Sequence, residues 1–191
     1  NIAACIVEPI AGSTGSLVPP KGYLKRLREI CDKHGILLIF DEVITGWGRT
    51  GEPFAAQSFD VTPDIITMAK GITNGVMPLG AVASRESIYD TLLDASPTGA
   101  IEFFHGYTYS AIPPCIAAGL AMQEIIKKEN LFERSKNMSP YFLDGLFSLK
   151  DIDIITDIRG YGMLGGIDIK FDERLGKAGF SCFKKLFEVG L

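Results

Sequence analysis

The sequence contains 191 residues, of which 47% are hydrophobic, and its 19 basic and 23 acidic residues give a net charge of −4. Such a chain can bury the core of about one domain, which excludes intrinsic disorder. The basic residues form no stripe, so nucleic-acid binding is not expected. No apolar run approaches the ~18 residues that a membrane span requires, and we expect neither a membrane segment nor a signal segment.

The four cysteines are widely separated and form no C-x-x-C pair. Cys5 and Cys31 fall within apolar patterns, which is typical of reduced core thiols in a cytoplasmic protein. No metal site is expected. The chain opens on a strand pattern without an initiator methionine and closes as a helical pattern ends. We therefore expect it to be an excerpt from a longer protein.

The first half of the chain has the pattern of a βαβ unit. Residues 2–7 predict a buried strand that ends at Glu8 and a glycine-containing loop. Residues 22–34 carry apolar side chains at helical spacing, with charges between them, and Gly35 ends this amphipathic helix. The apolar run 36–40 then predicts a second parallel strand, joined to the first by a right-handed crossover.

The strand 36–40 stops at two adjacent acids, Asp41 and Glu42. Its lack of alternation predicts a strand that is covered on both faces. In open α/β sheets, ligands bind at the carboxyl ends of the strands, where the loops diverge. Residues 44–51 are rich in glycine and therefore form a loop at this edge.

A third strand pattern, residues 65–68, is followed by Lys70. An aspartate and a lysine at neighbouring strand ends suit two contacts to pyridoxal 5'-phosphate. The carboxylate of Asp41 would pair with the ring nitrogen, and the amine of Lys70 would form the Schiff base. The alternative for these two residues alone is an ordinary ion pair at the edge of a sheet.

Turn residues 71–80 precede a short strand at 81–84, and Ser84 is placed to cap a helix over 85–93. Residues 103–110 are dense in aromatic and hydroxyl side chains and stand just before a long helix over 113–128. Hydroxyls at a helix start are well placed for a phosphate, because free amides and the helix dipole favour an anion there. His105 is assigned no chemistry, since a lone histidine in an aromatic loop is more often a packing group.

The composition changes after residue 129. Residues 130–150 predict a more polar helix, with Leu131, Tyr141, Phe142 and Leu146 facing inward. Strands at 152–158 and 164–170 and a helix at 180–188 follow. We therefore expect an α/β fold with a mostly parallel sheet and flanking helices over 1–129, a connecting helix over 130–150, and the start of a small α+β domain over 151–191.

Three stretches resemble the class III aminotransferases of pyridoxal-phosphate fold type I. They are Glu-Pro-Ile-Ala-Gly-Ser-Thr-Gly at 8–15, Asp-Glu-Val-Ile-Thr at 41–45 with Lys70, and His-Gly-Tyr-Thr-Tyr-Ser at 105–110. The resemblance covers essentially the whole chain and is greatest to the omega-amino acid:pyruvate branch. That branch tolerates an apolar residue at the position of Ile44, where many class III members have a glutamine that binds the ring hydroxyl.

The resemblance implies a role for each matching position. Val43 would press on the cofactor ring, and Thr108 would contact the cofactor phosphate from the partner subunit of a homodimer. Glu8 would belong to a substrate gate that pairs with a C-terminal arginine, and Trp47 would line the substrate channel. Structural roles for Glu8 and Trp47 are open alternatives.

The implied activity is transamination from an omega-amino acid or amine, such as beta-alanine, to a 2-oxo acid, pyruvate. Two alternatives remain open. One is another class III reaction, such as 4-aminobutyrate or ornithine-type transamination or an aminomutase reaction. The other is a fragment with only a structural or cofactor-binding capacity.

Overall fold

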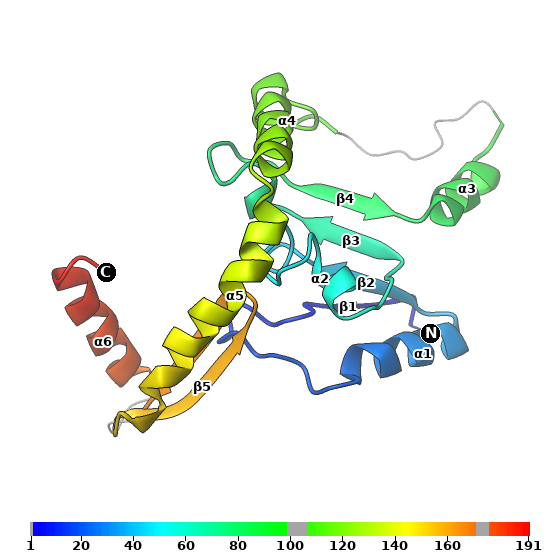
Figure 1. The fold of residues 1–191 in the computed structure, drawn as a ribbon. Coiled ribbons are helices and arrows are strands. Elements are labelled where there is room, and N and C mark those ends of the chain that lie inside the picture. The colour runs from blue at the N-terminus through cyan, green and yellow to red at the C-terminus, as the bar shows by residue number, and fades with distance from the viewer. Residues whose placement is uncertain (1, 99–106, 171–175) are drawn as a thin grey trace.

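The computed structural model describes residues 2–98, 107–170 and 176–191, and it contains two sheets with flanking helices (Figure 1). The strands and helices come in the following order: β1 (Ala4–Val7), α1 (Tyr23–His34), β2 (Leu37–Asp41), α2 (Ala55–Ser58), β3 (Ile65–Met68), η1 (Lys70–Ile72), β4 (Ala81–Ser84), α3 (Glu86–Ala95), α4 (Pro113–Lys128), α5 (Leu131–Phe147), η2 (Ser148–Asp151), β5 (Ile155–Tyr161), β6 (Leu164–Ile169) and α6 (Lys177–Glu188).

The larger sheet has the strand order β1-β2-β3-β4. β1, β2 and β3 run parallel, and β4 is antiparallel to β3. This confirms an α/β fold with a mostly parallel sheet. The carboxyl ends of β1, β2 and β3 therefore meet at one edge, and the loops that follow Val7, Asp41 and Met68 begin there.

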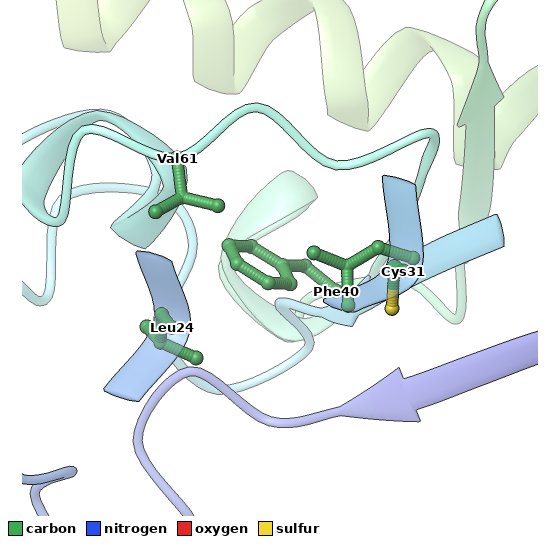
Figure 2. Close-up of a cluster of buried hydrophobic side chains, with 5 residues drawn as sticks. Leu24, Cys31, Phe40 and Val61 are labelled. Carbon is green, nitrogen blue, oxygen red and sulfur yellow. The ribbon is translucent and has the colours of Figure 1, made fainter. Parts of the chain in front are cut away.

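The core lies between α1 and one face of the sheet. Leu24 and Cys31 of α1 pack with Leu38 and Phe40 of β2 and with Val61 (Figure 2). Full burial of a side chain such as Phe40 contributes roughly 1.5–3 kcal/mol. α1 ends at Gly35, as its sequence indicates.

The expectation that β2 is covered on both faces is wrong for this chain. Leu38 and Phe40 are fully buried, whereas Leu37 is 36% exposed and Ile39 is half-buried. Residues in a strand alternate between faces, and α1 covers only one of them. β1 departs from its expected burial in the same way, because Ile6 is 61% exposed.

Asp64 ties the other edge of the sheet together, at the start of β3. Its carboxylate accepts a hydrogen bond from Leu38 N at 2.7 Å and pairs with Arg28 of α1 at 2.7 Å. Arg85, just before α3, lies 3.1 Å away on the other oxygen. Burial by itself would raise the pKa of Asp64, but the Leu38 amide and the two guanidinium groups hold that pKa below its usual value.

α4 and α5 follow one another along one side of the molecule and lead to the β5–β6 hairpin (Figure 1). Tyr141 of α5 is 76% exposed, so its expected inward orientation is wrong, whereas Phe142 packs against the hairpin at Gly165. α6 lies beside the hairpin and away from the larger sheet. The division at residues 129 and 150 stays a prediction.

Two short elements were missing from the sequence prediction, α2 and η1. Two helix starts also differ. α6 begins at Lys177, three residues before the predicted start at residue 180. Residue 85, not Ser84, is the N-cap of α3, and it makes no side-chain capping bond. Ser84 instead is the last residue of β4, where it pairs with Ile65.

In the part of the chain that the structure describes, no helix is both long and apolar enough to cross a membrane.

Candidate active site

The strand register places Asp41 and Lys70 at the same edge of the sheet. Asp41 is the last residue of β2 and stands opposite Thr67 of the parallel strand β3. β3 ends one residue later, and Lys70 begins the single turn η1. The aspartate and the lysine therefore follow neighbouring parallel strands at their carboxyl ends, as the sequence indicates.

The Asp41 carboxylate is held by its own loop. Its Oδ1 accepts a hydrogen bond from Val43 N at 3.1 Å, which is the one hydrogen bond to this side chain among the described residues. Both Asp41 and Val43 are half-buried. The bond fixes the direction of the carboxylate and leaves its second oxygen available to a ligand.

Lys70 has a left-handed backbone conformation, with φ 45°, which is uncommon for a residue with a side chain. Its side chain is exposed and makes no hydrogen bond or ion pair with a described residue. The sequence, with an apolar run before Lys70 and a glycine after it, predicts a lysine that is partly shielded from solvent, and this prediction is wrong for this chain by itself. Lys70 lies in a surface turn beyond the strand, and no described side chain folds over it.

Trp47 supports the turn that carries Lys70. A Cβ added to Gly71 would lie 2.5 Å from Cβ and 2.8 Å from Cγ of Trp47, so the backbone after Lys70 contacts the tryptophan directly. Trp47 also packs edge-on against Phe54, with ring centroids 5.4 Å apart. Its indole nitrogen is buried without a hydrogen-bond partner among the described residues. The loop after β2 and the turn after β3 thus form one packed unit.

Glu42 has a structural role that its position next to Asp41 in the sequence did not indicate. It is fully buried, and its carboxylate accepts hydrogen bonds from the Thr45 hydroxyl at 2.9 Å and from the amides of Ala55 and Ala56 at 2.7 and 2.8 Å. Burial raises the pKa of Glu42, against the lowering effect of these three donors. The side chain closes the loop between Asp41 and α2, and so holds that loop beside the site.

Glu8 and Ile44 meet at the same edge through the loop after β1. Glu8 Oε2 accepts a hydrogen bond from Gly12 N at 2.9 Å. A Cβ on Gly12 would lie 2.6 Å from Cδ1 of Ile44, so the two loops are in contact. Glu8 is half-buried and has a structural bond in its own loop. This bond uses Oε2 and leaves Oε1 of Glu8 without a donor among the described residues.

Thr108 is exposed in a turn that precedes α4. Two prolines at the first positions of α4 make the helix begin sharply at this point. α4 packs on the segment after Lys70, because a Cβ on Gly119 would lie 3.2 Å from Leu79 and 3.7 Å from the carbonyl of Ile72. A cavity of about 560 Å³ lies between these elements and extends to Tyr109. His105 lies outside the described residues.

The arrangement brings a directed carboxylate, and a primary amine without a partner among the described residues, to one edge of a parallel sheet. The amine can attack a carbonyl carbon and can carry a proton, and the carboxylate can stabilise a cationic ring nitrogen. The two groups are supported by a buried glutamate and by a tryptophan.

The model of the aminotransferase class-III family matches residues 1–191, and the chain belongs to this family. An omega-aminotransferase of Caulobacter vibrioides is 57% identical over 170 residues, which are 89% of this chain and 38% of that relative. The beta-alanine–pyruvate aminotransferase of Pseudomonas aeruginosa is 54% identical, over 88% of this chain and 38% of its own length.

The solved structures agree with the sequence relatives. The (S)-enantioselective omega-transaminase of Thermomicrobium roseum superposes with a TM-score of 0.82 at 40% sequence identity, over 89% of this chain and 37% of that chain. The fold is therefore that of the transaminases. This chain spans 38% of the length of the curated relatives described above.

Proposed function

We propose that this chain is part of an aminotransferase that moves an amino group from an omega-amino acid or amine to pyruvate, with pyridoxal 5'-phosphate as cofactor. The observation that carries this proposal is the placement of Asp41 and Lys70 at the carboxyl ends of adjacent parallel strands. Two relatives, an omega-aminotransferase and a beta-alanine–pyruvate aminotransferase that are 57% and 54% identical to this chain, support the reaction. The family implies the cofactor.

The residues present fit this cofactor. A pyridine nitrogen that must stay protonated needs an anionic acceptor, and Asp41 has one carboxylate oxygen without a described donor. An aldehyde needs a primary amine outside an ion pair, and Lys70 has no described partner. When bound, the cofactor supplies an electron sink for the reacting carbon of the substrate.

Residues of this chain bind the cofactor, orient its ring and move the proton at the reacting carbon. Asp41 orients the ring from the nitrogen side, and Val43 and Ile44 supply apolar contact beside it. Lys70 anchors the cofactor and then moves the proton at the reacting carbon with its Nζ. Glu8 and Trp47 border the path of the substrate. The protein is a homodimer in which Thr108 binds the cofactor phosphate at the partner subunit's site. The free cysteines of the chain fit a cytoplasmic location.

Lys70→Ala in the complete protein tests the proposal. Removal of the amine deletes both the covalent anchor and the proton carrier, so alanine formation from pyruvate and beta-alanine should fall by at least about 10²–10⁴-fold. Cofactor binding should persist, because Asp41 and the phosphate contacts do not depend on the lysine. Alanine would be measured together with the visible absorbance of protein-bound cofactor.

Lys33→Ala is the matched control, since Lys33 is an exposed lysine in the last turn of α1. It should leave both measurements unchanged. Near wild-type transamination by Lys70→Ala would remove the lysine from its role and the proposed function with it.

The amino donor is decided by a donor panel. With pyruvate as acceptor, beta-alanine should give a higher kcat/KM than 4-aminobutyrate or ornithine, because both relatives described above carry omega-amino or beta-alanine names. A preference for ornithine or 4-aminobutyrate would favour the alternative class III reactions.

A further inference from the structure

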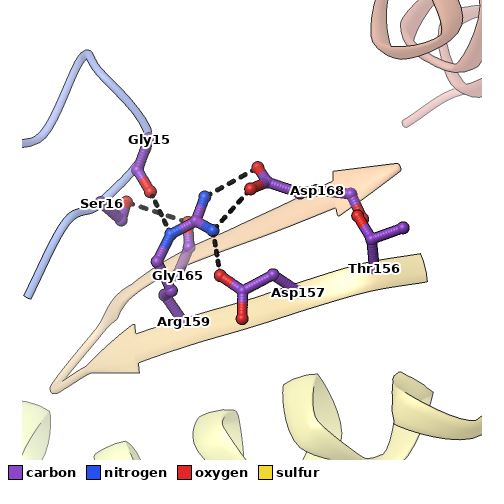
Figure 3. Close-up of polar contacts among 7 residues, drawn as sticks. All are labelled: Gly15, Ser16, Thr156, Asp157, Arg159, Gly165 and Asp168. Carbon is purple, nitrogen blue, oxygen red and sulfur yellow. Dashed lines mark hydrogen bonds and ion pairs between the residues drawn. The ribbon is translucent and has the colours of Figure 1, made fainter. Parts of the chain in front are cut away.

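The loop after β1 is held from outside the larger sheet by the β5–β6 hairpin. Figure 3 shows Arg159 of β5 turned toward this loop, with Asp157 and Asp168 around its guanidinium. Arg159 Nε donates to the Gly15 carbonyl at 3.0 Å. From the loop side, the Ser16 hydroxyl donates to the Gly165 carbonyl at 3.1 Å. These two bonds connect parts of the chain that are more than 140 residues apart.

Two neighbouring aspartates of the hairpin hold the Arg159 guanidinium in its orientation toward the loop. Nη1 and Nη2 bind the two carboxylate oxygens of Asp168, each at 2.8 Å, and Nη1 also contacts Asp157. Hydrogen bonds from the guanidinium to Asp168 and Asp157 raise the pKa of Arg159 further above its already high value. The Arg159 guanidinium is thus a rigid, permanently charged hydrogen-bond donor, and the Arg159 side chain is only 18% exposed.

The fit between hairpin and loop leaves no room for additional atoms. A Cβ on Gly166 would lie 2.6 Å from the Gly15 carbonyl oxygen, the same oxygen that Arg159 binds. Gly15 itself has φ 125°, a conformation that other residues rarely adopt. Both glycines are therefore needed for the close approach of the two backbones.

The same loop carries Glu8 at its other end. Gly15 N and Ser16 N donate to the Gly12 carbonyl at 3.1 and 3.0 Å, and Gly12 N donates to Glu8 Oε2. A short chain of contacts therefore runs from Arg159 through the turn 12–16 to the Glu8 carboxylate, and from Gly12 to Ile44. These contacts connect the Gly15 carbonyl to both Glu8 and Ile44.

We propose that Arg159 is a positioning residue that sets substrate affinity by holding the loop 8–17 against the edge of the sheet that carries Asp41 and Lys70. The inference rests on the proposed function, because it takes that edge as the substrate site. Arg159 acts through the Gly15 carbonyl and touches neither Glu8 nor the reacting groups. It is therefore expected to change the binding of substrate more than the chemical step.

Arg159→Lys in the complete protein is the main test. Lysine keeps the charge but cannot bind Asp168 with two donors and Gly15 with a third. The KM for beta-alanine should rise roughly tenfold with kcat changed by less than about threefold, as expected for the loss of a charge-assisted hydrogen bond outside the chemistry. Amide hydrogen exchange of a peptide spanning 8–18 should become faster, while a peptide spanning 36–43 should not change.

Arg26→Lys is the matched control, because Arg26 is 72% exposed and pairs with Glu29 within α1. It should alter neither KM nor exchange. Gly166→Ala provides an independent route to the same effect, since its Cβ would push the Gly15 carbonyl away. It should also raise KM and speed exchange in the peptide 8–18.

Each result decides between the inference and its rivals. A fall in kcat with unchanged KM, or no change in either KM or loop exchange, would overturn the positioning role of Arg159. If the wild-type protein does not transaminate, the proposed function fails, and the substrate half of the inference fails with it. Faster exchange in the variant would in that case still show that the hairpin holds the loop.

Discussion

Asp41 and Glu42 are adjacent acids with different tasks. Asp41 is half-buried with one hydrogen bond from a described residue, whereas Glu42 is fully buried with three donors around its carboxylate. Neighbouring side chains at a strand end point in opposite directions, so one acid faces the crevice and the other faces the loop that follows. The loop closes on Glu42 and thereby leaves Asp41 accessible.

The ionisation of Asp64 makes the free energy of unfolding depend on pH. Its carboxylate joins β2, α1 and the segment before α3, at the edge of the sheet opposite the site. Its pKa is lower in the folded chain than its ordinary value of 3.8. The ionised form therefore stabilises the fold fully above the unfolded pKa, and this stabilisation is lost as pH falls through the lower, folded pKa.

Asp64→Asn is expected to lower the free energy of unfolding near neutral pH by roughly 1.5–3 kcal/mol, because Arg28 loses a charge-assisted hydrogen bond but keeps its ion pair with Asp32. The difference between wild type and variant should shrink as the pH is lowered below 3.8, where the unfolded chain begins to bind the proton, and should vanish once the pH lies below the lower, folded pKa. Urea unfolding at a series of pH values measures this difference. A difference that stays constant from pH 6 to pH 3 would contradict the assignment.

At the scale of elements, the site depends on contact between a loop and a turn. The loop after β2 contains Trp47, and the turn η1 contains Lys70 and Gly71. The contact of Trp47 with Gly71 leaves no space for a side chain. The position of Lys70 is thus set by packing between elements and not by the strand alone.

Gly71→Ala is expected to displace the turn and with it Lys70. Overpacking of this kind costs about 1–3 kcal/mol, and a displacement of the reacting amine by about 1 Å costs roughly 100-fold in rate. Thermal unfolding and alanine formation in the complete protein measure the two effects. The rate should fall more than the stability alone explains.

Gly145→Ala is the control for this substitution. Gly145 lies inside α5, and an added Cβ meets nothing within 4 Å. It should raise the free energy of unfolding by about 0.5–1 kcal/mol and leave the rate unchanged. Partial recovery of the rate in Gly71→Ala combined with Trp47→Ala would support the steric origin; an unimpaired Gly71→Ala variant would refute it.

At the scale of the whole molecule, the chain presents apolar side chains on several faces. Ile6 of β1, Val82 of β4 and Phe187 of α6 are 61%, 69% and 72% exposed. Apolar surface of this kind marks regions that pack against other protein. Thr108 is also exposed, in a turn that projects before α4. The chain spans 38% of the length of its curated relatives, so these apolar faces are available to the rest of the protein as well as to a second subunit. The exposed position of Thr108 fits the proposed contact with the phosphate of a partner's site.

Mixed dimers test the shared site. Subunits with Lys70→Ala would be combined with subunits that carry Thr108→Asp, whose charge repels a phosphate. If Thr108 serves the partner's site, each mixed dimer contains one intact site, and random mixing should recover about a quarter of wild-type alanine formation. The parent variants should each be nearly inactive.

The outcome distinguishes the two arrangements directly. If Thr108 serves the site of its own subunit, every site in the mixed dimer carries one lesion, and activity should not exceed that of the variants alone. Mixing each variant with itself after the same unfolding and refolding treatment controls for losses in handling.

The local pattern of the sequence predicted most of the elements and the positions of Asp41 and Lys70 at the ends of β2 and β3. Apolar runs that stop at acids or before a lysine predicted β2 and β3 with Asp41 and Lys70 at their ends, and Gly35 predicted the end of α1. These features depend on neighbouring residues in the chain. Local propensity and spacing are therefore enough to read them.

Only the tertiary structure decided which side chains are structural and which remain available. Three features join segments that lie apart in the sequence. They are the buried hydrogen bonds of Glu42, the contact of Trp47 with Gly71, and the hydrogen bond from Arg159 to the Gly15 carbonyl. The exposure of Lys70, Leu37 and Tyr141 likewise follows from which faces are covered by other elements. No local pattern contains this information, because burial and hydrogen bonding at these positions are fixed by how distant segments pack.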